Sequence, residues 1–147
     1  MIGEDGNLYG SGYNAHGQFG NGKTANSHNF KWLLADVKAA EGGGGHIVAV
    51  KKDGSLWASG YNVNGELGDG TGKTRNTFEK VIEKDVAHAS AGYHHTVAMK
   101  QDGSLWVTGY NNHGQLGDGT TATRKSFVKI IVLNLKLSQR KNLESDE

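Results

Sequence analysis

Histidines are the side chains of this sequence most suited to chemistry, because a neutral imidazole can bind a metal ion or accept a proton. Seven are present, and His88, His94, His95 and His113 fall within one stretch. Adjacent residues of a strand point to opposite faces, so His94 and His95 cannot chelate an ion from one side. His95 also has a counterpart in His46, with similar residues around it. We therefore expect no metal site, and a structural hydrogen bond within the repeat for His46 and for His95.

Glycine-rich stretches could cradle a phosphate, as at residues 20–22 and 68–70. A phosphate loop lies between a strand and the start of a helix, and no helix is predicted after either stretch. Asp5, Asp53 and Asp102 stand in isolated Asp-Gly pairs, unlike the clustered carboxylates of a calcium loop. No Ser-His-Asp set and no pair of carboxylates stands out. The sequence therefore predicts no cofactor, no catalytic residue and no enzyme.

A single pattern occurs three times in the chain. It reads Asp-Gly-x-Leu-aromatic-x-x-Gly-Tyr-Asn-x-x-Gly-x-Leu/Phe-Gly-x-Gly and occupies residues 5–22, 53–70 and 102–119. A period near ~50 residues is typical of stacked or radial repeats, in which no unit can bury its apolar face alone. The pattern predicts architecture more directly than it predicts function.

The residues around this pattern favour short β-strands. Small residues dominate residues 86–92, and residues 94–100 mix β-branched and apolar side chains. The Asp-Gly pair that follows suits a tight hairpin turn, because glycine accepts a positive φ. We expect an all-β chain with about four short strands per repeat, as in a propeller blade. Further strands are predicted at residues 43–51, 56–61, 78–82, 105–110 and 127–131.

Positions that stay constant between the copies are expected to build the fold. The aromatic residue of each return strand is expected to pack between neighbouring units, and the glycine three residues later indicates a close approach of backbone. The apolar residues Phe19, Leu67 and Leu116 are expected to pin their polar loops to the sheet. The structural positions are Tyr9, Trp57, Trp106, Gly12, Gly60, Gly109, His46 and His95.

Composition limits the partners that the chain can bind. The net charge is +1, from 16 basic and 15 acidic residues, which gives no large field for nucleic acid or membrane lipid. Cysteine is absent, so disulfides and thiol chemistry are excluded. No signal peptide or transmembrane segment is recognised, and we expect a soluble protein whose compartment the sequence does not indicate.

Positions that vary between the copies are the ones free to recognise a partner. They fall in loops, which neighbouring units present side by side, and loops commonly carry function. Solvated loop tips without a function are the alternative interpretation. The candidate binding residues are His16, Asn64, Tyr93, His113, Arg75 and Arg124.

Residues 92–119 resemble the repeat of the regulator of chromosome condensation 1 (RCC1) family, Gly-x-x-His-Thr-x-Ala-x-x-x-Asp-Gly-x-Leu-x-x-x-Gly-x-Asn-x-x-Gly-Gln-Leu-Gly-x-Gly. Residues 43–70 are similar, with Ile47 in place of threonine and Glu66 in place of glutamine. Residues 5–22 match the second half. The residues of the repeat resemble those of bacterial-type members of the family more than those of the eukaryotic chromatin protein. The resemblance implies blades of a β-propeller that has seven blades in the family.

The copies are too few for that ring, so we expect a partial, open propeller. Residues 1–36 are assigned to the second half of a blade, 37–84 to a second repeat and 85–133 to a third. Residues 134–147 are expected to start a further strand and end in a polar tail. The missing blades would come from a longer parent chain or from other subunits. Sheet faces left open in this way favour edge pairing and aggregation.

The expected function is that of a protein-interaction scaffold with an unidentified protein partner. Guanine-nucleotide exchange on a small GTPase is one alternative, because the resemblance implies the activity of the family's founder. Inhibition of an enzyme, as by a secreted bacterial propeller with similar repeats, is another. A non-functional gene fragment is the third.

Overall fold

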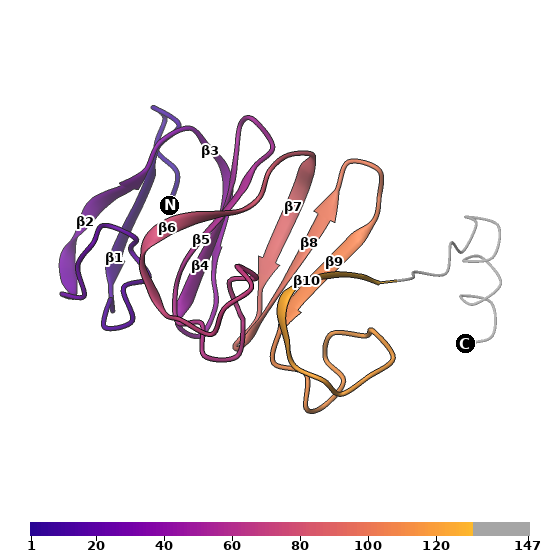
Figure 1. Cartoon of the computed structure of the whole chain (residues 1–147). Helices are drawn as coiled ribbons and strands as arrows, with labels where there is room; N and C mark the ends of the chain where they lie inside the picture. The colour runs from indigo at the N-terminus through magenta and orange to yellow at the C-terminus, as the bar shows by residue number, and fades with distance from the viewer. Residues whose placement is uncertain (131–147) are drawn as a thin grey trace, which may run out of the picture.

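The structure is a computed structural model that describes residues 1–130, and it consists of ten β-strands in three antiparallel sheets (Figure 1). In the first sheet, β1 (Leu8–Gly12) pairs with β2 (Ser27–Leu34). None of the residues described forms a helix that could span a membrane. The expectation of an all-β chain is confirmed, whereas the strand expected after residue 133 lies outside the described residues.

The second and third sheets each contain four strands in the order in which the chain forms them. β6 and β10 each begin three residues earlier than the sequence analysis placed them, at Arg75 and Arg124. The three sheets lie side by side, with the first at the left of Figure 1 and the third at the right. The second sheet comprises β3 (Val37–Gly42), β4 (His46–Lys51), β5 (Leu56–Gly60) and β6 (Arg75–Ile82). The third comprises β7 (Val86–Ala91), β8 (His95–Lys100), β9 (Leu105–Gly109) and β10 (Arg124–Ile130).

The Asp-Gly pairs form the hairpin turns expected of them. Gly54 has a φ of +83°, a conformation that favours glycine, and Gly103 repeats it at +82°. The Asp53 carboxylate accepts hydrogen bonds from the Ser55 backbone N–H at 2.9 Å and from the Ser55 hydroxyl. These bonds lower the pKa of Asp53, the hydroxyl bond contributing most. The turn therefore fixes the register of β4 against β5.

The hydrophobic core lies between the sheets. The second sheet presents Val48, Val50, Leu56 and Ala58, all at most 1% exposed, to the third sheet. Leu67 projects from the loop after β5 into the same cluster, and Phe19 occupies the same place in the cluster between the first two sheets. Each sheet thus needs its neighbour to exclude water from its apolar face.

The strand that follows each Asp-Gly turn carries an aromatic residue, and in the second and third sheets this residue faces the preceding sheet. Trp106 packs against the core of the second sheet, and Trp57 lies opposite Ala49, which belongs to the core shared with the first sheet. Lysine ammonium groups lie over the rings, with Lys51 Nζ 5.0 Å from the Trp57 centroid and Lys100 Nζ 4.7 Å from that of Trp106. Each lysine belongs to the same sheet as its tryptophan, so these contacts add cation–π attraction between neighbouring strands of one sheet.

The expectation that His46 forms a hydrogen bond within its own repeat is wrong. His46 instead links the second sheet to the third. Its Nε2 lies 2.9 Å from the Thr96 hydroxyl of β8, and its ring is 1% exposed. Threonine occurs at this position in the third sheet and Ile47 in the second, so the bond requires the neighbouring sheet. Burial lowers the pKa of His46 to about 4, and the nearby His94 and His95 add to the shift.

Leu67→Ala is expected to destabilise the protein by about 2–5 kcal/mol, because it opens a cavity at a side chain with no solvent exposure. Val63→Ala in the same loop is the matched control, since Val63 is 54% exposed. Urea titrations monitored by tryptophan fluorescence measure both. Equal midpoints for the two variants would show that Leu67 does not anchor its loop.

The folded protein is expected to lose stability as pH falls from about 6.5 to about 4, because the unfolded chain binds a proton at His46 that the folded chain excludes. The loss attributable to His46 reaches roughly 3 kcal/mol below this window. His46→Gln should flatten the pH dependence of the free energy of unfolding. His28→Gln, at an exposed histidine, should retain the wild-type dependence, and identical slopes for the two variants would contradict the assignment.

Candidate functional site

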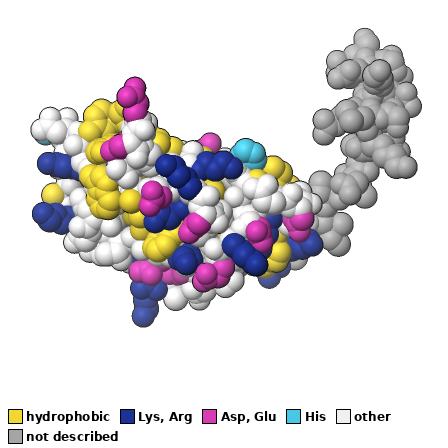
Figure 2. Space-filling model, turned by 90° about the horizontal axis from the view of Figure 1, so that it is seen from above, with side chains coloured by type: hydrophobic (Ala, Val, Ile, Leu, Met, Phe, Trp, Pro, Cys, Tyr) yellow, Lys and Arg dark blue, Asp and Glu magenta, His cyan; other side chains and the backbone are white. Residues whose placement is uncertain are grey.

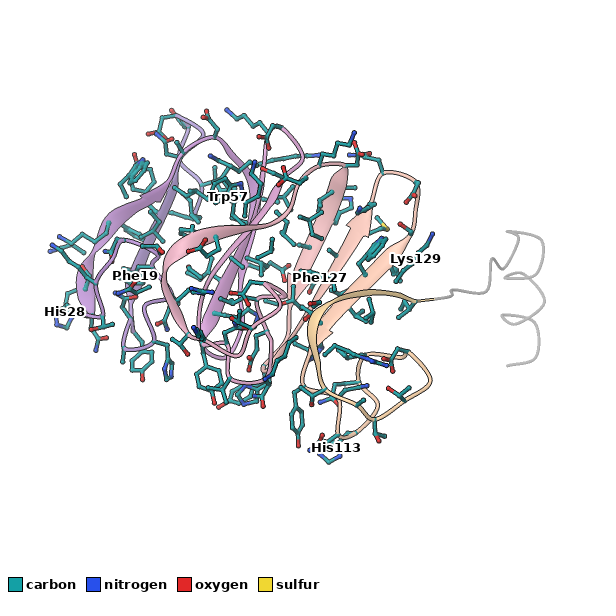
Figure 3. The ribbon with its side chains drawn as sticks, viewed as in Figure 1. Phe19, His28, Trp57, His113, Phe127 and Lys129 are labelled. Atoms are coloured by element: carbon teal, nitrogen blue, oxygen red, sulfur yellow. The ribbon has the colours of Figure 1, made fainter. Side chains whose placement is uncertain are left out.

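The loops that vary between repeats gather at one end of the sheets. This end carries the turns between β3 and β4 and between β7 and β8, together with the long loops that follow β1, β5 and β9. His113, in the last of these loops, lies at the lower end of Figure 3, opposite the Asp-Gly turns. Loops from all three sheets therefore share one surface.

Seven rings cross this surface in contact with one another, and we call them the aromatic row. Centroids of neighbouring rings lie 4.5–6.3 Å apart, mostly in edge-to-face geometry. Such pairs contribute roughly 0.5–1.5 kcal/mol each beyond the area that they bury. Tyr93 is 74% exposed and Tyr13 is 55% exposed. The row consists of Tyr13, His16, Tyr61, Tyr93, His94, Tyr110 and His113.

One buried asparagine organises each long loop. The Asn62 carbonyl oxygen accepts the Leu67 N–H at 3.0 Å, while its amide donates to the carbonyls of Thr71 and Lys73 at 3.1 and 3.0 Å. Asn14 and Asn111 make the equivalent bonds in the other two loops, and all three asparagines are fully buried. The side chain thus satisfies backbone groups that would otherwise be buried without partners.

Backbone contacts fix the tyrosines of the row. The Tyr61 N–H donates to the Gly45 carbonyl and the Tyr110 N–H to the His94 carbonyl, both at 2.9 Å. Gly109 precedes Tyr110 with a φ of +111°, and a Cβ there would stand 2.5 Å from the His94 oxygen. Gly60 is placed equivalently against Gly45. Strand and turn approach so closely that only glycine fits.

Gly12 differs from its two counterparts. Its φ is +99°, but no atom lies within 4 Å of the place where its Cβ would stand. Among the described residues the first sheet has two strands, and no turn equivalent to those at Gly45 and His94 lies beside β1. The requirement for glycine at position 12 is therefore the backbone conformation alone.

Small and large residues alternate at the turns that border the row. Gly45 stands where the third sheet has His94, and a Cβ on Gly45 would lie 3.0 Å from His16 and 3.1 Å from Tyr61. The absence of a side chain at Gly45 leaves room for the ring of His16, whose centroid lies 5.1 Å from that of Tyr61. In the next repeat, His94 fills this place and contacts Tyr61 and Tyr110.

A buried carboxylate orients the central histidine. Glu66 is fully buried and accepts hydrogen bonds from the Asn64 N–H at 2.9 Å, the Asn64 amide at 3.0 Å and His94 Nδ1 at 3.1 Å. Gln18 and Gln115 accept the corresponding N–H bonds in the other loops, and the described residues show no hydrogen bond from either glutamine to a histidine ring. Because the carboxylate accepts, Nδ1 of His94 carries a proton and Nε2 is left for other interactions.

The structure brings together only some of the candidate binding residues. His16, Tyr93 and His113 belong to the aromatic row. Asn64 lies beside the row, where its amide donates a hydrogen bond to the Glu66 carboxylate. Arg75 and Arg124 do not join it, because each begins a strand and pairs with a loop aspartate. Their Nε atoms lie 3.0 and 2.8 Å from the carboxylates of Asp69 and Asp118.

Four members of the aromatic row are not among the candidate binding residues. Tyr13, Tyr61 and Tyr110 are invariant between the copies, and invariance was taken to indicate structure. His94 was considered only as a metal ligand. Within residues 1–130 no three histidine, aspartate or glutamate side chains converge as a metal site would require. The row therefore offers hydrogen bonding and aromatic contact.

The opposite end of the sheets has a different character. Figure 2, which views that end, shows lysine and arginine side chains intermingled with aspartate and glutamate. Hydrophobic side chains gather there on the side of the first sheet. The aromatic row is thus confined to the long-loop end, and no single-sign charge dominates the other.

Asn62→Ala is expected to lower the free energy of unfolding by about 2–4 kcal/mol, because several buried backbone groups lose their partners at once. The row should loosen with its loop, which one- and two-dimensional NMR would report as shifted Tyr61 and His16 ring resonances. Asn112→Ala, at an exposed asparagine of the equivalent loop, should change stability by under about 0.5 kcal/mol. Similar losses in both variants would rule out the organising role of Asn62.

Comparison with known proteins agrees with the geometry. Two family models described as the regulator of chromosome condensation (RCC1) repeat match residues 53–99 and 86–115. No curated protein matches the chain. Among solved structures, human WBSCR16 is 21% identical with a TM-score of 0.79, over 89% of this chain and 36% of its own. Yeast RCC1 (Prp20) bound to Kap60 is 20% identical with a TM-score of 0.71, over 88% and 34%.

A second structure of Prp20p, from Saccharomyces cerevisiae, is 19% identical with a TM-score of 0.68 and covers 88% of this chain and 35% of its own. The chain thus spans about a third of the length of these relatives. Its four-stranded sheets are blades of a β-propeller, and the described sheets form an open part of one. Residues 53–115 of this chain thus carry repeats of the regulator of chromosome condensation (RCC1) type.

Proposed function

We propose that this chain is a protein-interaction scaffold that binds a protein partner through the aromatic row. The observation that carries the proposal is the continuity of the row across all three sheets. Tyrosine is enriched among residues that dominate binding energy, because its large ring loses little conformational entropy on binding. A surface assembled from three blades engages a partner only when the blades are docked.

The chemistry of the row suits a polypeptide. Tyrosine rings offer apolar faces together with hydroxyl groups, and the histidines add ring nitrogens that donate or accept hydrogen bonds. The row carries no cluster of lysine or arginine that would track a phosphate backbone. A peptide segment can satisfy both the apolar and the hydrogen-bonding groups.

The structural relatives supply probes for the partner. Prp20p is described with Kap60, Gsp1p and histones, so these proteins form a first panel. Guanine-nucleotide exchange and enzyme inhibition are the narrower alternatives for this scaffold. No contact among the described residues favours either one.

Tyr93→Ala is expected to weaken binding to the partner by about 30-fold, as for a residue contributing roughly 2 kcal/mol at an interface. Binding is measured by titration against each purified probe, and against proteins captured from a lysate by the wild-type chain. Glu83→Ala is the control, because the Glu83 side chain is 85% exposed and lies just after β6, outside both the row and the first sheet. A partner that binds wild type and Tyr93→Ala equally but is lost on Glu83→Ala would overturn the proposal.

A further inference from the structure

The same joint connects the first sheet to the second and the second to the third. Phe78, the fourth residue of β6, lies over Gly20 in the preceding loop, and Phe127, the fourth residue of β10, lies over Gly68. A Cβ on either glycine would collide with the phenyl ring. Figure 3 shows Phe127 in the space between the second and third sheets. Each phenylalanine thus fills a niche that glycine leaves open.

Backbone and hydroxyl bonds accompany each phenylalanine. The Gly22 N–H donates to the Asn76 carbonyl at 2.7 Å, and the Gly70 N–H donates to the Lys125 carbonyl at 2.8 Å. Isolated bridges join Asn21 to Thr77 and Asp69 to Ser126 beside these bonds. The Ser59 hydroxyl donates to the Gln18 carbonyl at 2.6 Å, and that of Thr108 donates to the Gly65 carbonyl at 2.7 Å. The joint is therefore a defined set of contacts that the chain builds twice.

The first sheet carries one half of this joint without a partner among the described residues. Phe30, the fourth residue of β2, is equivalent to Phe78 and Phe127 but is 59% exposed. Ser11, directly before Gly12, is equivalent to Ser59 and Thr108 and is exposed. Trp32 and Met1 beside them are 54% and 70% exposed. His28, at the far left of Figure 3, marks this end of the molecule.

The third sheet carries the other half. Gly117 is equivalent to Gly20 and Gly68, and no atom of residues 1–130 lies within 4 Å of the place where its Cβ would stand. Gly119, the counterpart of Gly22 and Gly70, is equally open. The sheet behind them repeats the apolar face that the second sheet buries. Its members are Val97, Met99, Leu105, Val107 and Leu116.

We propose that two copies of this chain associate head to tail, with the first sheet of one copy docked on the third sheet of the next. Phe30 of one copy occupies the Gly117 niche of its neighbour. The Gly119 N–H donates to the His28 carbonyl, and the Ser11 hydroxyl donates to the carbonyl of Gly114 or Gln115. These contacts repeat the joint that the chain uses internally.

A second copy fits these ends because each copy brings both halves of the joint. The two halves lie at opposite ends, marked by His28 and Lys129 in Figure 3. The contact is therefore heterologous, and a dimer still has one free end of each kind, so assembly continues until a ring closes or a filament forms. Burial of the exposed Phe30 and Trp32 against the half-buried Val97, Met99 and Leu105 removes further apolar surface from water, whereas Val107 and Leu116 are already buried.

Sedimentation of the full chain over a range of concentrations tests the proposal. The wild type should form species larger than a dimer as concentration rises. Phe30→Asp on the first sheet, or Met99→Asp on the third, should each weaken association by at least about 30-fold. Val63→Asp, at an exposed residue of the long-loop end, should associate as wild type does. Circular dichroism verifies that each variant keeps its β-structure.

Mixing the two single variants gives the sharper result. Phe30→Asp keeps an intact third sheet and Met99→Asp an intact first sheet, so their mixture should form a one-to-one dimer and nothing larger. Wild-type protein that stays monomeric overturns the proposal, including when it binds a different repeat-containing chain. Equal association by all three Asp variants, or growth of the mixture beyond a dimer, also overturns it. Since Tyr93 is outside the joint, loss of partner binding in Tyr93→Ala leaves this test unaffected.

Discussion

The structure depends on hydrogen bonding inside three long loops that have no regular secondary structure. A loop packed against a sheet buries N–H and C=O groups that no strand pairs, and an unpaired buried group costs about 1–3 kcal/mol. Asn14, Asn62 and Asn111 each satisfy several of these groups from one fully buried amide. An amide is suited to this role because it donates and accepts at the same time. Once the loop is fixed, Phe19, Leu67 and Leu116 are held over the core.

The fixed loops also make the joints between sheets possible. Gly20 and Gly68 lie at the same point of two identically folded loops, so each meets the phenylalanine of the following sheet in the same way. The hydroxyls of Ser59 and Thr108 then reach loop carbonyls whose positions the asparagines determine. Propeller blades stack with little interlocking of their strands, and here the loop supplies the specificity of the contact.

Much of the fold could be predicted from the repeated pattern, because glycine, the Asp-Gly turns and the alternating apolar residues impose local geometry. The hairpin turns and the buried loop residues follow from residue type alone. The role of Asn62 could not be predicted from residue type, because its hydrogen-bond partners lie up to eleven residues away along the chain. The asparagine at this position of all three copies was the available signal. His46 was misassigned to its own repeat because a sequence does not show which sheet will lie beside a strand.

The site was less predictable than the fold because variation and invariance both contribute to it. Three tyrosines of the row are invariant between the copies. Their rings are connected because the size of the side chain at the variable positions between them differs from one repeat to the next. Gly45 omits a side chain and admits His16, whereas His94 supplies one and bridges Tyr61 to Tyr110. Glu66, a single departure from glutamine, then accepts a hydrogen bond from His94 across the joint. A continuous surface therefore arises from three similar repeats through differences at positions that touch the next blade.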